Sequence, residues 1–256
     1  MAIENIKNIN QINYDKMEEG FIKTDFGNMY FKHNESKDQH IKIIMIHGLG
    51  GTTKSFAKLI DNLPNDIDIY LIDLLGHGNS DKPKIKYSID IQVTALSQFI
   101  EKTKYSNFYL LGHSYGGFVA LKYLLNFGTE KIKALILEDS AGLKEYYDLV
   151  TKDKKFINNR LNDPFHSKSS SKFIMRNILS NLKNEGLTDL SYVDKPVLII
   201  WGKKDAVIKP YFANKFKSKL KNSKLRIIEN AEHIPHYSHF NQVSTILLKF
   251  IKYNKK

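Results

Sequence analysis

One short segment near the middle of the chain constrains the fold more than any other. The apolar run 108–111 leads directly into Gly112-His113-Ser114-Tyr115-Gly116-Gly117, and the apolar run 118–127 follows. The first run indicates a buried strand and the second a helix, so the glycines fall at a sharp turn between them. Such a turn strains its serine and raises the hydroxyl above the edge of a parallel sheet. Ser114 is therefore the candidate nucleophile.

The rest of the chain alternates strands and helices. We expect a hairpin within residues 20–34 and further strands at 41–46, 67–72, 134–137, 196–201 and 225–228. Helices are expected at 54–62, 88–103 and 240–253, with Ser88 as the N-cap of the second. This order predicts an α/β fold in which a mostly parallel central sheet carries helices on both faces.

Residues 143–190 interrupt this alternation. They hold no convincing strand and predict two or three short helices joined by polar links such as 167–171. We expect residues 1–142 and 191–256 to form the core and residues 143–190 to form a small helical lid (cap) over the strand ends, where ligands bind in such sheets. The lid carries five aromatic residues, of which some should face the site while several can instead pack the lid onto the core: Tyr146, Tyr147, Phe156, Phe165 and Phe173.

Ser114 needs a base, because a serine hydroxyl is a poor nucleophile at neutral pH. His233 is the candidate, since it follows the last expected strand in a loop that can reach back over the sheet. Asp205, just past the strand at 196–201, is the candidate carboxylate that orients this histidine. Asp139, at the end of the strand at 134–137, is its rival, and the chain order serine, acid, histidine favours Asp205.

The glycine-rich loop His47-Gly48-Leu49-Gly50-Gly51 follows the first expected parallel strand. Acyl transfer builds negative charge on an oxygen, and two backbone N–H groups usually stabilise it. We expect these donors to be the amides of Tyr115, directly after the nucleophile, and Leu49, in this loop. No Gly-Lys-Ser or Gly-Lys-Thr sequence follows the loop, which argues against a nucleotide site.

Composition excludes other classes of site. The chain has no cysteine, so disulfides, thiolate metal sites and a cysteine nucleophile are excluded. His233, His236 and His239 suggest a metal site, but no carboxylate cluster stands near them in the sequence. We expect neither a metal nor a cofactor. We also expect a cytoplasmic protein without stable membrane insertion, because no apolar run matches a signal peptide or a membrane span.

The net charge of +12 is unevenly distributed. Residues 1–142 carry 16 Lys and Arg against 17 Asp and Glu, whereas residues 143–256 carry 23 against 10. Such an excess can attract an anionic substrate, an acidic lipid or nucleic acid. The lysines are scattered and no nucleic-acid motif accompanies them, so we interpret them as a solvated surface and expect no nucleic-acid partner. A monomer or homodimer is expected.

Five motifs occur in a fixed order: HGLG at 47–50, DLLGHGNS at 73–80, GHSYGG at 112–117, WGKKD at 201–205 and HIPH at 233–236. Together they resemble the α/β-hydrolase superfamily, and more narrowly its small, lid-bearing serine esterases with the related carbon–carbon hydrolases and cofactor-free perhydrolases. Two positions depart from the pattern. Glu232 stands where glycine is usual, and Ser238 stands where an acid is common.

The resemblance implies a catalytic triad of Ser114, Asp205 and His233, and an oxyanion hole made by the amides of Leu49 and Tyr115. It implies a carboxylesterase that cleaves small esters through an acyl-enzyme intermediate. The alternatives are a carbon–carbon bond hydrolase or a cofactor-free perhydrolase of the same fold, and a ligand-binding receptor without turnover. Epoxide hydrolases and dehalogenases are disfavoured, because they carry aspartate at the position of Ser114.

Overall fold

The computed structural model describes residues 11–36, 41–150, 152–162, 171–182 and 185–254. Within them, eight strands form one sheet in the order β1-β2-β4-β3-β5-β6-β7-β8. The hairpin strands β1 and β2 are antiparallel, and β2 is antiparallel to β4, whereas the remaining neighbours are parallel. The strands are β1 (Glu18–Thr24), β2 (Gly27–Asn34), β3 (Lys42–Ile46), β4 (Asp68–Ile72), β5 (Phe108–His113), β6 (Ile132–Glu138), β7 (Val197–Gly202) and β8 (Ser223–Ile228).

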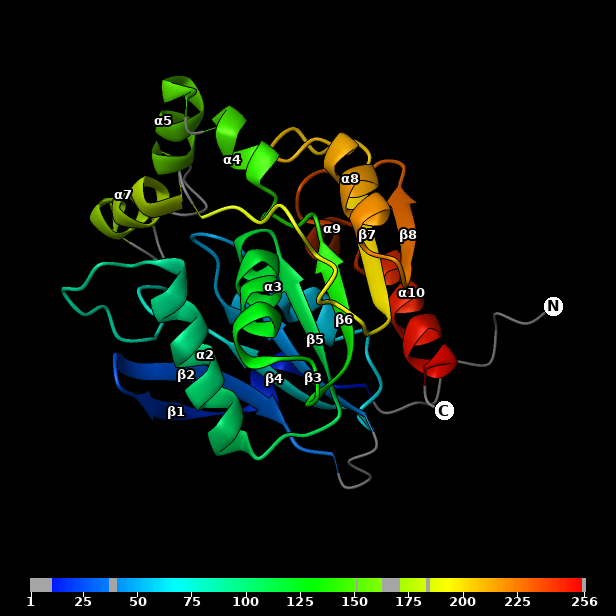
Figure 1. Cartoon of the computed structure of the whole chain (residues 1–256). Coiled ribbons are helices and arrows are strands. Elements are labelled where there is room, and N and C mark those ends of the chain that lie inside the picture. The colour runs from blue at the N-terminus through cyan, green and yellow to red at the C-terminus, as the bar shows by residue number, and fades with distance from the viewer. Residues whose placement is uncertain (1–10, 37–40, 151, 163–170, 183–184, 255–256) are drawn as a thin grey trace.

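Helices cover both faces of this sheet, and the predicted α/β architecture is confirmed. In Figure 1, α2 and α3 cover one face, and α10 lies on the opposite side. The helical elements are η1 (Tyr14–Lys16), η2 (Thr53–Phe56), α1 (Ala57–Ile60), α2 (Ile89–Thr103), α3 (Tyr115–Phe127), α4 (Lys144–Val150), α5 (Lys154–Asn162), α7 (Lys172–Asn181), α8 (Tyr211–Lys219), α9 (Pro235–Ser238) and α10 (Phe240–Tyr253).

The central strands are apolar throughout because both of their faces are buried. In β3, Ile44 and Ile46 pack into the core beneath α2 and α3, while Ile43 and Met45 pack into the core beneath α1 and α10. All four side chains are fully buried, and each contributes about 1.5–3 kcal/mol through removal of apolar surface from water. The continuous apolar runs in the sequence therefore specify strands that separate two hydrophobic cores.

Helix boundaries follow local chemistry. As predicted, Ser88 caps α2, its Oγ accepting a hydrogen bond from the Ile91 amide at 3.4 Å. Helix α3 begins directly after Ser114, earlier than the apolar run 118–127 indicates. Gly116 and Gly117 lie in its first turn. Because glycine is a poor helix former, the sequence pattern indicates a longer turn before the helix. A side chain at Gly116 would clash with backbone carbonyl oxygens at the end of β3.

The segment between β6 and β7 holds α4, α5 and α7, which lie beyond the carboxyl ends of the strands (Figure 1). Its two ends meet. The Leu187 amide donates to the Gly142 carbonyl at 2.7 Å, and the Lys144 amide donates to the Leu187 carbonyl at 3.0 Å. The side chains of Phe156 and Phe165 and the link at 167–170 lie outside the described residues.

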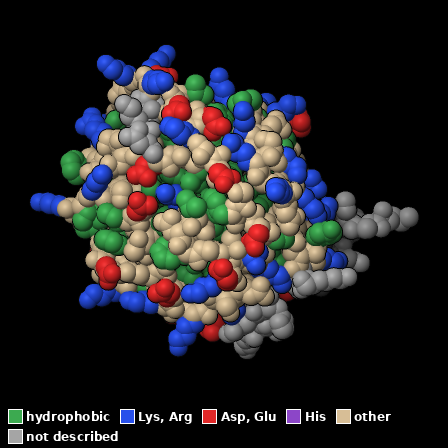
Figure 2. Space-filling model, viewed as in Figure 1, with side chains coloured by type: hydrophobic (Ala, Val, Ile, Leu, Met, Phe, Trp, Pro, Cys, Tyr) green, Lys and Arg blue, Asp and Glu red, His purple; other side chains and the backbone are tan. Residues whose placement is uncertain are grey.

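The surface offers no single basic patch in the view of Figure 2. Lys and Arg side chains are spread around that face, and Asp and Glu side chains lie among them. None of the helices in the described ranges has the length and apolarity that crossing a bilayer requires.

Candidate active site

Ser114 lies at the carboxyl end of β5, in the turn that connects this strand to α3. Its backbone has φ of 52° and ψ of −117°, a left-handed conformation that costs a non-glycine residue on the order of 1–3 kcal/mol. Neighbouring backbone holds it there. The Ser114 amide donates to the Glu138 carbonyl at 2.9 Å, and the Ser114 carbonyl accepts from the amides of Gly117 and Ala141, both at 3.0 Å.

The structure brings the three side chains named in the sequence analysis into one hydrogen-bonded row. The Ser114 Oγ lies 3.0 Å from His233 Nε2, and His233 Nδ1 lies 2.8 Å from Asp205 Oδ2. Because a carboxylate only accepts, Nδ1 carries the proton that points to Asp205, and Nε2 is left free to accept from the serine hydroxyl. Asp205 is held in turn by the amides of Val207 and Ile208, which donate to its Oδ1 at 2.7 and 2.9 Å.

Asp139, the rival acid, lies beside this row and does not contact His233 directly. Its Oδ1 accepts from the Gly202 amide at 3.0 Å. Burial, and next the charge of Asp205, raise the pKa of the Asp139 carboxyl well above its usual range. Asp139, Asp205 and His233 are the one described group of three potential metal ligands within 4.8 Å of one another. Asp205 and His233 are already hydrogen-bonded to each other.

Two pairs that the sequence analysis did not identify hold the His233 loop. His113 Nε2 donates to the His233 carbonyl at 2.7 Å, and burial lowers the pKa of His113 well below its usual value. Glu138 accepts from both the amide and the Nδ1 of His236, at 2.8 and 2.6 Å, and both residues are fully buried. His236 therefore anchors the loop and forms no ligand cluster with His233 and His239. The sequence signal that could indicate this pair is Glu138, a charged residue at the end of an otherwise apolar strand.

The loop that carries Leu49 is held from the opposite side. Asp73 accepts from the amides of Thr53 and Asn79 at 2.6 and 2.9 Å, and burial raises the pKa of its carboxyl to about 6. Tyr115 is the first residue of α3, where a helix amide has no partner within the helix. Neither this amide nor that of Leu49 has an acceptor within the described residues. Both residues line the same cavity as Ser114.

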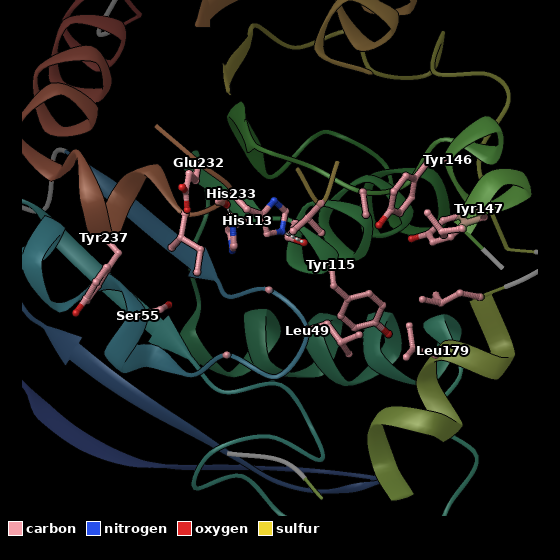
Figure 3. A pocket seen from close by; sticks show the side chains of 18 of the residues that line it. Leu49, Ser55, His113, Tyr115, Tyr146, Tyr147, Leu179, Glu232, His233 and Tyr237 are labelled. Atoms are coloured by element: carbon pink, nitrogen blue, oxygen red, sulfur yellow. Dashed lines mark hydrogen bonds between the residues drawn. The ribbon is translucent and has the colours of Figure 1, made fainter. Parts of the chain in front are cut away.

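A cavity of about 390 Å³ opens at Ser114 and has two different ends. Figure 3 shows Tyr146, Tyr147 and Leu179 to one side of His233, and Ser55, Glu232 and Tyr237 to the other. The first end is apolar and formed largely by α4 and α7, and the second lies between η2 and α9 and is more polar. Tyr146 and Tyr147 of α4 line the cavity, whereas Phe173 is exposed and is not among the lining residues.

Comparisons with known proteins agree on one family. The model for the family described as alpha/beta hydrolase fold matches residues 42–174. The chain is similar to lipase 3 of Moraxella sp. (strain TA144), at 27% identity over 227 residues, and to lipase 1 of Psychrobacter immobilis, at 25%. Each match spans 75% of this chain and 71% of the relative. The solved esterase of Exiguobacterium antarcticum, 24% identical, has a TM-score of 0.77 and covers 92% of this chain and 100% of its own.

Proposed function

The chain belongs to the α/β-hydrolase fold family, and we propose that it is a serine hydrolase of the carboxylesterase type, which cleaves small carboxylic esters. The observation that carries the proposal is the hydrogen-bonded row of Ser114, His233 and Asp205 at the mouth of an apolar cavity. Its similarity to two lipases and an esterase supports an ester as the substrate.

In the proposed mechanism, His233 Nε2 takes the hydroxyl proton of Ser114 while the oxygen attacks the ester carbonyl. Asp205 stabilises the imidazolium that forms. The amides of Leu49 and Tyr115 stabilise the oxyanion of the tetrahedral intermediate. His233 then gives its proton to the departing alcohol, which leaves an acyl group on Ser114. A water molecule, deprotonated by His233, releases the acid and restores the serine.

The cavity supports a small and uncharged substrate. Its volume of about 390 Å³ lies near the lower end of the range of roughly 300–1,000 Å³ typical of ligand pockets. Its described lining contains no Lys or Arg, and Glu232 adds a negative charge. A diketone-like acid, the substrate class of the carbon–carbon hydrolase alternative, would lack a cationic partner there. A side-by-side assay of aryl esters and a ring-fission product separates the two.

The segment 143–190 acts in this proposal as a lid, because α4 and α7 form the apolar end of the cavity. The Leu187 amide nitrogen lies 2.7 Å from the Gly142 carbonyl oxygen. Residues 143–186 can therefore be removed and Gly142 joined to Leu187, because these two residues are already neighbours. The shortened protein should fold cooperatively and hydrolyse esters with a changed chain-length preference. A chain that no longer folds would contradict the division into core and lid.

The experiment that tests the proposal compares wild type, Ser114→Ala and Ser97→Ala on aryl esters of increasing acyl length. Ser97 is a buried serine on α2, outside the row, and serves as the matched control. We expect Ser114→Ala to lower kcat by about a million-fold and to abolish labelling by a fluorophosphonate probe, and Ser97→Ala to do neither. Labelling that persists in Ser114→Ala would refute the assignment. A tight ligand without product would support the receptor alternative.

A further inference from the structure

A second carboxyl group lies directly behind the row, and the mechanism above does not use it. Asp139 follows the last residue of β6, has φ of 42°, and its side chain is 0% exposed. Its Oδ1 accepts one backbone hydrogen bond, from Gly202. Its Oδ2 is buried and meets no donor within the described part of the chain, and no Lys or Arg of that part forms an ion pair with it.

The carboxyl groups of Asp139 and Asp205 face each other. One oxygen of each, and a ring nitrogen of His233, lie within 4.8 Å of one another. Asp205 already accepts three hydrogen bonds, from His233 Nδ1 and from the amides of Val207 and Ile208. A carboxylate offers about four acceptor positions, so one remains. Two ionised carboxylates at this separation would repel and provide no donor, whereas one acid and one carboxylate form a charge-assisted hydrogen bond.

We propose that Asp139 is a positioning residue, held as a neutral carboxylic acid whose O–H donates a hydrogen bond to Asp205. The inference rests on the function proposed above, because it assigns Asp139 a part in that mechanism. The pair carries one negative charge. The hydrogen bond from Asp139 fixes the Asp205 carboxylate with Oδ2 toward His233, so that the charge is in place when the imidazolium forms.

The groups that face Asp139 favour its neutral form. Burial is the largest cause that raises the pKa of the Asp139 carboxyl, and the acidic groups of Asp205, from the loop after β7, and of Glu138, from β6, raise it further. The hydrogen bond from the Gly202 amide lowers this pKa and so acts in the opposite direction. It follows that Asp205→Asn removes the neighbouring charge that disfavours ionisation of Asp139. Asp139 then loses its proton and returns one negative charge to within 4.8 Å of a His233 nitrogen.

The test compares the wild type with Asp139→Asn, Asp205→Asn and the double variant, measuring kcat/KM for one aryl ester as a function of pH. Asp139→Asn keeps an N–H donor for Asp205 and removes no charge. We expect it to lower kcat/KM by less than about tenfold and to leave the apparent pKa of the base in place. Asp205→Asn should lose about 10- to 100-fold, and the double variant about 10⁴-fold, the cost typical of removing the triad acid.

Infrared spectroscopy detects directly whether the Asp139 carboxyl group is protonated. The carbonyl stretching band of a protonated carboxylic acid should be present in the wild type at pH 7, move when aspartate carboxyls carry ¹³C, and vanish in both Asp139→Asn and Asp205→Asn. The isotope shift needs no variant to fold. Asp68→Asn is the matched control, since Asp68 is buried at the opposite end of the sheet and its loss should leave band and pH profile unchanged.

Two results would overturn the proposal: a wild type without the band, or an Asp205→Asn variant as inactive as the double variant. Failure of the proposed function gives a different result. In that case the wild type does not hydrolyse the ester at all, or Ser114→Ala hydrolyses it equally well, while the infrared band still decides whether Asp139 is protonated.

Discussion

Replacing Glu138 with Gln tests how the structure holds the His233 loop. Glu138 accepts two hydrogen bonds from His236, at 2.8 and 2.6 Å, and neither residue is exposed. The side-chain oxygen of Gln can accept only one of these two hydrogen bonds. Its NH2 group would face the other N–H group of His236, and two donors cannot bond to each other. A change of tautomer at His236 does not solve this, because its Nε2 has no partner within the described residues and would carry a stranded proton.

Each buried polar group left without a partner costs about 1–3 kcal/mol. Glu138→Gln should therefore lower the free energy of unfolding by about 3 kcal/mol, and the Tm by about 6–12 °C for a chain of this size. Activity should fall as well, because α9 carries the residues that follow His233, and a displacement of about 1 Å can cost about a hundredfold in rate.

Urea unfolding monitored by tryptophan fluorescence measures the stability change, and ester hydrolysis by the folded variant measures the rate. The matched control is Glu101→Gln, an exposed carboxylate on α2, which should change stability by less than about 0.5 kcal/mol. If Glu138→Gln is as stable as this control, then the His236–Glu138 pair does not anchor the loop and the reasoning is wrong.

Three further predictions follow from the same geometry. Gly116→Ala should destabilise the fold by at least about 2 kcal/mol in urea unfolding, because its methyl group meets backbone oxygens that cannot move away; a stable variant contradicts the close approach of α3 to β3. Leu182→Ala enlarges the apolar end of the cavity, so kcat/KM for an ester with two more acyl carbons, divided by kcat/KM for the shorter ester, should rise about tenfold. If this ratio does not change, the acyl chain does not bind at the apolar end. Burial raises the pKa of Asp73 to about 6, so the folded state binds its proton more tightly than the unfolded state. Stability from this group is present at low pH and lost as the pH rises through 6. Between pH 7 and pH 4 the wild type should gain about 2 kcal/mol relative to Asp73→Asn in urea unfolding, and an equal pH dependence of the two proteins would disprove it.

Much of the fold follows from local patterns. The apolar runs predict β3 to β7 because these strands are buried on both faces, and the apolar stripe at 240–253 matches the bounds of α10. Helix α3 begins at Tyr115, three residues before the apolar run 118–127 that indicates it. Glycine has a low helix propensity, but Gly116 is required where the helix passes close to β3, so tertiary packing overrides the local preference.

The site depends on contacts that no local pattern encodes. Ser114 and His233 are 119 residues apart, and Glu138 and His236 are 98 apart, yet each pair is in hydrogen-bond contact. Chain order ranked Asp205 above Asp139 as the partner of His233, and the contact of His233 with Asp205 is the one that forms. The sequence could not show that both carboxyls lie together, because the ends of β6 and β7 become neighbours only in the sheet.

Acid quenching of the protein during hydrolysis of a slow aryl ester, followed by peptide mass spectrometry, measures directly whether Ser114 carries the acyl group during turnover. We expect one acyl adduct, on the peptide that contains Ser114, and none in His233→Ala. Steady turnover with no adduct, or an adduct on another residue that persists in Ser114→Ala, would contradict this expectation.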